Sequence, residues 1–103
     1  MKTFKDYEEN IIRLTDERYA HILEHSEMSE FIDKIGEILI EPDYIIQSPI
    51  DTNVKIFTRN YITKSFAGKY TCVVVKYLLD DAFIITAYIT NKLPKGETIW
   101  QKN

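Results

Sequence analysis

The sequence predicts a single α+β domain in which two N-terminal helices pack on one face of a four-stranded, or slightly larger, antiparallel β-sheet. Three observations lead to this prediction. The 103 residues are a common length for one domain and too few for two cores. Apolar residues recur at helical spacing between Thr15 and Ile40. After Pro42 the pattern changes to runs of β-branched and aromatic residues, with no helical segment between them.

The first helix is expected to begin after Thr15 and to end near Ser26. Thr15 is a good N-cap, and the acids at 16–17 place negative charge where the first backbone N–H groups point. Residues 10–14, just before it, are either a short β-like segment or an extended lead-in. Ser29 is the N-cap of the second helix, which the 3–4 rhythm of apolar residues carries to Ile40.

The second half of the chain reads as a meander of strands. Asp80 and Asp81 separate two β-branched and aromatic runs, which is the strongest hairpin signal in the chain. Residues 62–69, with Gly68, are expected to form a loop. Trp100 is either a packing anchor or a ring available for stacking. The expected strands are 44–47, 54–61, 69–79, 82–90 and, as a short strand or docked tail, 98–100.

Charge is distributed unevenly along the chain. Residues 1–52 hold 5 basic and 13 acidic side chains, a balance of −8, whereas residues 53–79 hold 5 basic side chains and no acid. This asymmetry favours a surface that attracts an anion, although lysines on the wet face of a sheet give the same pattern. The single cysteine, Cys72, excludes an internal disulfide and fits a reducing compartment. No signal-peptide or membrane-length apolar stretch is present, so we expect a cytoplasmic protein that does not use a membrane.

Three polar residues, Arg18, His21 and His25, follow i, i+3, i+7 spacing and form one stripe beside the apolar stripe of the first helix. A stripe in this position can reach the edge of the sheet. Two imidazoles there are suited to proton transfer near neutral pH, but two ordinary surface histidines share the spacing. Zinc is a third interpretation, weakened because the residues between the histidines do not form a metalloprotease motif and no third histidine exists.

Alternation along the strands predicts which side chains share a face. The expected core set is Val73, Val75, Tyr77, Leu79, Phe83, Ile85, Ala87 and Ile89. The opposite, uncovered face would then present Lys55, Arg59, Lys76, Thr86 and Tyr88 beside aromatic rings. Cations bind phosphate, hydroxyls orient it and rings stack on unpaired bases, so this set suits single-stranded RNA. A solvated face with scattered aromatics is the alternative, and a slip of one residue would reverse each assignment.

Two segments give the chain a family resemblance. Residues 15–25 follow the pattern T-x-E-R-x-x-H-I-x-x-H, and residues 85–88 read I-T-A-Y. With the order of the elements, they make residues 11–100 similar to the phage-type branch of the barnase–EndoU–colicin–RelE-like (BECR) ribonuclease superfamily. The family often has a basic residue before the second histidine and a proline after it, where this chain has Glu24 and Ser26.

The resemblance implies two helices on a four-stranded antiparallel sheet and RNA cleavage without a metal or other cofactor. It also implies a role as a toxin or effector of a mobile element, acting on RNA such as transfer RNA or ribosome-bound messenger RNA, with a cognate antitoxin or immunity protein as partner. The residues that match the family's functional positions are His21, His25, Arg18, Arg59, Thr86 and Tyr88.

The resulting hypothesis is an endoribonuclease that cleaves by attack of the RNA 2′-OH on the adjacent phosphorus. His21 would transfer one proton, with His25 or Tyr88 as the second group. Arg59 and Lys76 would stabilise the phosphorane and Thr86 would position it. Arg18, Lys55, Lys64 and Lys69 would bind substrate. Two rivals remain: a non-catalytic RNA- or ribosome-binding module, and a protein-interaction domain that works through its acidic helices.

Overall fold

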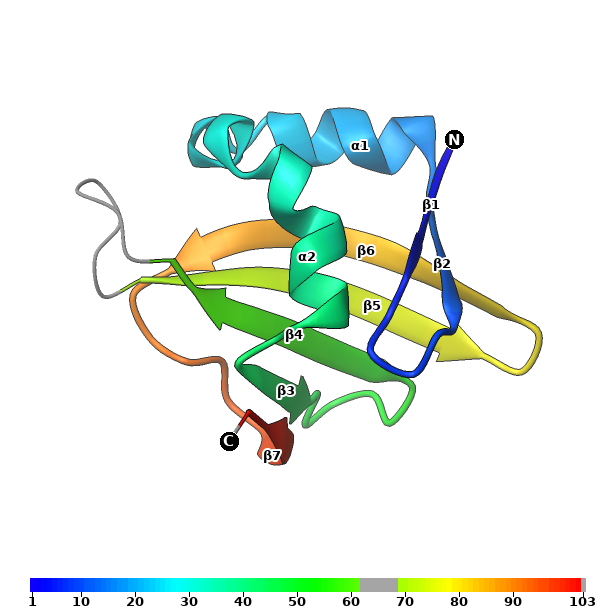
Figure 1. Cartoon of the computed structure of the whole chain (residues 1–103), viewed down its shortest axis with the longest axis vertical. Coiled ribbons are helices and arrows are strands. Elements are labelled where there is room, and N and C mark those ends of the chain that lie inside the picture. The colour runs from blue at the N-terminus through cyan, green and yellow to red at the C-terminus, as the bar shows by residue number, and fades with distance from the viewer. Residues whose placement is uncertain (62–68, 103) are drawn as a thin grey trace.

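The computed structural model describes residues 1–61 and 69–102, except the side chain of Glu30. Within these residues, seven strands form one sheet in the order β1-β2-β6-β5-β4-β3-β7 (Figure 1). The strands are β1 (Lys2–Lys5), β2 (Ile11–Leu14), β3 (Tyr44–Gln47), β4 (Val54–Asn60), β5 (Tyr70–Leu78), β6 (Asp81–Thr90) and β7 (Glu97–Gln101). The helices are α1 (Asp16–Leu23) and α2 (Ile35–Ile40), separated by the 3₁₀ turns η1 (Ser26–Glu30) and η2 (Ile32–Lys34).

The predicted four-stranded antiparallel meander is the centre of the sheet, β3 to β6. The prediction is incomplete at both sides, because β7 pairs with β3 and a β1–β2 hairpin joins β6. The junction of β2 with β6 is parallel, through the pair Arg13 and Phe83, so the sheet is mixed. The expected short strand at 98–100 and the β-like alternative for residues 10–14 are confirmed as β7 and β2. Strand β1 was not predicted, because it is mostly exposed and lacks the alternating pattern that reveals a strand.

The second helix differs from its prediction. Residues expected to form one helix from Ser29 to Ile40 form η1, η2 and the short α2. Met28 and Phe31 are both buried, and their spacing of three residues suits the 3.0 residues per turn of a 3₁₀ helix. The backbone at Phe31, with φ −114° and ψ 2°, then separates the two turns. The predicted end before Pro42 is confirmed, since α2 ends at Ile40.

The helices cover one face of the sheet, as predicted. Figure 1 shows α1 running beside β6 while α2 crosses in front of β5 and β4. Phe57 on β4 is fully buried in this layer, and the N-terminal strands contribute Ile12 and Leu14. The rest of the core comprises Ile22, Met28, Phe31, Ile35, Ile38, Leu39, Ile45, Val73, Val75, Ala82, Ile84 and Ala87.

The opposite face is less open than expected. Ile46, Thr58 and Cys72 point away from the helices, yet all three are fully buried. The segment 91–96, which returns from β6 to β7, meets this face at Gly96, since a Cβ there would be only 2.8 Å from Ile46 Cγ2. The uncovered part of this face is therefore narrower than four strands.

Candidate functional site

The stripe on α1 reaches the sheet edge, as its position beside the apolar stripe predicted. The hydroxyl of Thr15 accepts a hydrogen bond from the backbone N–H of Arg18 at 3.2 Å and begins the helix. Ile22 is fully buried, which turns the polar stripe toward β6. Arg18 Nη1 then donates to the backbone carbonyl of Ile85 on β6 at 3.4 Å. The guanidinium is thus tied to β6 next to Thr86.

The two imidazoles lie against each other on the surface. The rings of His21 and His25 meet edge to face, with centroids 6.0 Å apart and planes 87° apart. His21 Nδ1 is 3.5 Å from a carboxylate oxygen of Glu24. Because Nδ1 faces the carboxylate, Nε2 is the nitrogen that a ligand can reach. The side chain of His21 is 52% exposed, so solvent has access to it.

On β6, a bulge changes which residues face the core. The β5–β6 register shifts between Val74 and Val75, whose partners are Thr86 and Ile84, so Ile85 is the extra residue. Ile84 is consequently fully buried, and the prediction that Ile85 and Phe83 belong to the core is wrong. Beyond the bulge, Ala87 is buried and Ile89 packs against the core, as predicted.

Leu79 was also expected in the core, but it is 98% exposed because it lies in the β5–β6 turn. Thr86 and Tyr88, which follow the bulge, face away from the helices as predicted, because they pair with Val74 and Cys72.

Tyr88 leans over β5 rather than toward α1. It pairs directly with Cys72, and burial together with that thiol raises the pKa of Tyr88 to about 12. Burial likewise raises the pKa of the Cys72 thiol to about 12, an effect that the neighbouring Tyr88 hydroxyl only partly offsets. At neutral pH the phenol therefore keeps its proton and can donate a hydrogen bond. The buried Cys72 is therefore a protonated thiol, which is a poor nucleophile.

The stripe and the end of β6 run alongside each other. Figure 1 shows α1 and β6 side by side and pointing in the same general direction. The hydrogen bond from Arg18 to Ile85 holds the first turns of α1 beside the bulge of β6. His21 on α1 and His25 just after it belong to the layer that covers one face of the sheet, whereas Thr86 and Tyr88 face the other side.

Two predicted cations lie on the wrong face. Lys55 and Arg59 alternate with Phe57, and the burial of that ring turns all three toward the helices. Arg59 Nη1 donates to the carbonyl of Glu41 at 2.8 Å, and its Nη2 is 3.2 Å from a carboxylate oxygen of Glu37.

The ammonium of Lys55 lies over the Tyr77 ring, 5.0 Å from its centroid. The prediction that Lys55 and Arg59 share a face with Lys76 is therefore wrong, because the hydrophobic gain of burying Phe57 decides the orientation of β4.

The other predicted cations are dispersed. Lys76 does share the face of Thr86, but its Nζ is 3.2 Å from Asp51 Oδ2, toward the opposite end of β5 from Tyr70. Lys69 precedes β5 and is half-buried, and Lys64 lies outside the described residues. Trp100 packs against the core beside Tyr7, with ring centroids 5.8 Å apart, which confirms its interpretation as a packing anchor.

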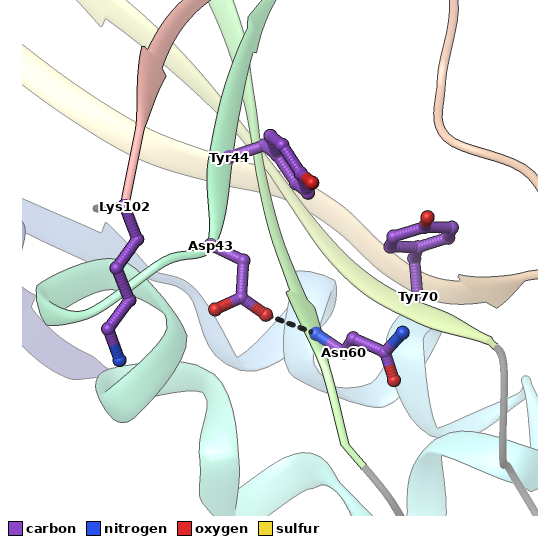
Figure 2. Close-up of a pocket in the computed structure, with 5 residues that line it drawn as sticks. All are labelled: Asp43, Tyr44, Asn60, Tyr70 and Lys102. Atoms are coloured by element: carbon purple, nitrogen blue, oxygen red, sulfur yellow. Dashed lines mark hydrogen bonds between the residues drawn. The ribbon is translucent and has the colours of Figure 1, made fainter.

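A pocket that the sequence did not reveal lies at the other side of the same sheet face. It is a cavity of about 250 Å³ lined by Asp43, Tyr44, Asn60, Tyr70 and Lys102 (Figure 2). Asn60 pairs with Tyr70 across β4 and β5, whereas Tyr44 is on β3 and Lys102 follows β7. These residues come from four separate parts of the chain, so no local spacing could have predicted the pocket.

In the described part of the chain, no group of three or more His, Cys, Asp or Glu side chains could hold a metal ion. None of the helices in residues 1–61 and 69–102 is long and apolar enough to cross a membrane.

Comparison with known proteins defines the class. Residues 1–101 match the family model of the phage-Barnase-EndoU-ColicinE5/D-RelE like nuclease2 family. Because the match spans nearly the whole chain, the protein belongs to this family, and the predicted resemblance is confirmed. This family is part of a nuclease superfamily, so a nucleic acid is the expected class of substrate. Comparisons with curated proteins and with solved structures gave no significant match.

Proposed function

We propose that the protein is a metal-independent endoribonuclease that cleaves RNA at the edge formed by α1 and β6. The observation that carries the proposal is the pair of imidazoles in ring contact, exposed His21 on α1 and half-buried His25 just after it, next to the hydrogen bond by which Arg18 joins α1 to β6. Membership of a nuclease family supports the substrate class. The choice of RNA follows from the chemistry that two imidazoles perform, since the ribose 2′-OH supplies a nucleophile within the substrate.

The reaction needs no group beyond these side chains. His21 Nε2 takes the proton of the 2′-OH as the 2′-oxygen forms a bond to phosphorus. The bond from phosphorus to the 5′-oxygen then breaks, and His25 donates a proton to that oxygen. The products are a 2′,3′-cyclic phosphate and a 5′-OH end.

In this proposal, charge on the phosphorane is stabilised by the guanidinium of Arg18 and by two hydroxyls of β6. Arg18 takes the role that the resemblance assigned to Arg59, because Arg59 is engaged with α2. Thr86 positions a phosphate oxygen from β6. Tyr88 acts as a hydrogen-bond donor, since a phenol whose pKa is raised to about 12 holds its proton at neutral pH.

Glu24 takes part as a positioning residue. The family often has a basic residue at this place, but here a carboxylate lies 3.5 Å from His21 Nδ1. A carboxylate on this nitrogen favours the tautomer with the proton on Nδ1, which leaves Nε2 as the acceptor for the 2′-OH. The acid thus supports the base instead of attracting phosphate.

A non-catalytic RNA-binding module is the second candidate. It is favoured by the ion pairs that occupy Arg59 and Lys76, which leave fewer cations to stabilise a phosphorane. This candidate predicts RNA binding that weakens with salt and leaves the RNA intact. The role as a toxin or effector of a mobile element, with a protein that neutralises it, is part of the first proposal and would appear as toxicity on expression.

The test is incubation of purified protein with mixed cellular RNA in EDTA, followed by analysis of the fragment ends. Wild type should produce cyclic phosphates, and His21→Ala should slow cleavage by roughly 10²–10⁴-fold, the usual contribution of a general base or acid. Ala20→Ser, an exposed change on the same helix, is the matched control and should cleave like wild type. Intact RNA with well-folded wild type, or cleavage abolished by EDTA, would contradict the proposal.

A further inference from the structure

The pocket lined by Asp43, Tyr44, Asn60, Tyr70 and Lys102, called here the tyrosine pocket, has no part in the proposed proton transfers. At about 250 Å³ it is somewhat smaller than the ~300–1,000 Å³ sites that take drug-sized ligands. Its size and its two rings suit a single flat group. Three features of the pocket indicate what it can hold: its rings, its polar edge and its position.

The two tyrosines are not used by the core. Both are half-buried and belong to the sheet face opposite the helices. The partly buried aromatic residues that do pack against the core are Phe4, Tyr7, Tyr19, Tyr61, Tyr77 and Trp100. In Figure 2 the rings of Tyr44 and Tyr70 stand on the same side of the strands. Two tyrosine rings outside the core provide stacking surfaces for an unpaired base.

The polar edge of the pocket is fixed by the backbone. Asp43 Oδ2 accepts a hydrogen bond from the backbone N–H of Asn60 at 2.8 Å, and the carbonyl of Asp43 accepts one from the backbone N–H of Lys102 at 2.9 Å. These bonds position the carboxylate, as Figure 2 shows. Within the described residues, neither Asp43 Oδ1 nor the side-chain amide of Asn60 has a hydrogen-bond partner. The acceptors and donors that remain match the hydrogen-bonding edge of a nucleobase.

The position of the pocket relates it to the proposed cleavage site. Tyr70 pairs with Thr90 on β6, and Tyr88 is the next residue on the same face of that strand. Side chains diagonal to one another on neighbouring strands are about 7–8 Å apart. A strand of RNA with its phosphate near Thr86 and Tyr88 therefore has the tyrosine pocket beside it across β5.

We propose that the tyrosine pocket binds one unpaired nucleobase of an RNA strand, stacked on Tyr44 and Tyr70 and held at its edge by Asp43 and Asn60. Lys102, whose ammonium forms no ion pair within the described residues, lies at the rim and attracts the phosphate backbone. The choice of RNA as the source of the base rests on the proposed function, but the binding of a base does not depend on cleavage.

The test is a titration of the protein with the four nucleoside 5′-monophosphates, followed by the NMR signals of its backbone amides. The amide of Asn60 is the reporter, because it bonds to Asp43 inside the pocket. Saturable shifts of this signal are expected with nucleotides but not with ribose 5-phosphate, which lacks a base. Tyr70→Leu and Asp43→Asn should each weaken binding, the former at least about fivefold, as expected when a stacking ring is lost.

Asp43→Asn keeps the shape of the side chain, so the inference stays testable if Tyr70→Leu does not fold. Equal shifts with ribose 5-phosphate, or nucleotide affinity unchanged in both variants, would overturn the inference. Wild type that cleaves RNA but binds no nucleotide at Asn60 would also overturn it while leaving the proposed function intact. Nucleotide binding by a protein that leaves RNA uncut would support the tyrosine pocket and contradict the nuclease proposal.

Discussion

The edge formed by α1 and β6, which we call the α1 edge, and the tyrosine pocket differ in how the chain assembles them. The residues of the edge come from one helix and one strand, at spacings that can be read directly from the sequence. The tyrosine pocket draws on four separate parts of the chain and depends on the pairing of β3, β4 and β5. Local periodicity therefore finds the residues proposed to transfer protons, whereas the pocket proposed to hold a base emerges only when the strands are paired.

The largest effect on stability is expected at Gly96, which leads into β7 and hence to the Lys102 side of the pocket. Gly96 has φ +136°, and a Cβ there would lie 2.1 Å from the carbonyl oxygen of Gln47. Gly96→Ala should lower the free energy of unfolding by about 2–4 kcal/mol in urea titrations, because both strain and a clash with backbone arise.

Gly36→Ala is the matched control. Its Cβ would meet only the Phe4 side chain, at 3.2 Å, and alanine favours a helix, so the change should stay within about 1 kcal/mol of wild type. If the two variants are equally stable, the segment 91–96 does not lie against the sheet as described. If Gly96→Ala folds, it should weaken nucleotide binding at the tyrosine pocket more than it affects the α1 edge.

A smaller effect is expected at Arg59, which the structure assigns to the scaffold. Its side chain is only 19% exposed and forms ion pairs with Glu37 in α2 and with Glu41 just after that helix. These pairs join β4 to α2. Arg59→Gln should therefore cost about 1–2 kcal/mol of unfolding free energy, since a hydrogen bond from a charged donor is lost, Glu41 loses its ion pair and Glu37 keeps only the pair with Lys34. Lys76→Gln, which breaks the single pair with Asp51, should cost less than about 1 kcal/mol. Equal costs would contradict this assignment.

These residues show how far the sequence could predict the molecule. The N-cap at Thr15, the end of α2 before Pro42 and the β5–β6 hairpin all follow from local chemistry and are confirmed. Which face of β4 points toward the helices could not be predicted in this way. Charged side chains at alternate positions can extend past a buried ring to reach acids on a helix. Lys55 and Arg59 do so on either side of Phe57.

Two further features had no local signal. The bulge at Ile85 reverses the faces of the first part of β6, and nothing in the run of apolar residues indicates where it falls. The sequence therefore predicted the sheet face of Thr86 and Tyr88 correctly but not that of Ile84. The tyrosine pocket needs the register Asn60 to Tyr70, which depends on the whole sheet.

The smallest effect concerns the junction of β2 with β6, which holds the start of α1 at the edge. The Arg13 guanidinium hydrogen-bonds Asp81 and lowers the pKa of that carboxyl. A depressed folded-state pKa contributes stability above the unfolded pKa of about 3.9, and this contribution is lost as the pH falls through the folded value.

The stability difference between wild type and Asp81→Asn should therefore shrink from pH 7 to pH 3 in urea titrations. Asp80→Asn is the control, since Asp80 forms no ion pair in the part of the chain that the structure describes. A difference that stays constant between the two pH values would show that the Arg13–Asp81 pair does not titrate in this way.

In the proposed division of labour, the α1 edge performs the chemistry and the tyrosine pocket holds the substrate. Steady-state cleavage of one short single-stranded RNA by wild type, His21→Ala and Tyr70→Leu separates the two roles. We expect His21→Ala to lower kcat by roughly 10²-fold or more with little change in KM, and Tyr70→Leu to raise KM at least about fivefold with kcat largely kept. A His21→Ala enzyme with the wild-type kcat, or a Tyr70→Leu enzyme that loses kcat and keeps its KM, would contradict it.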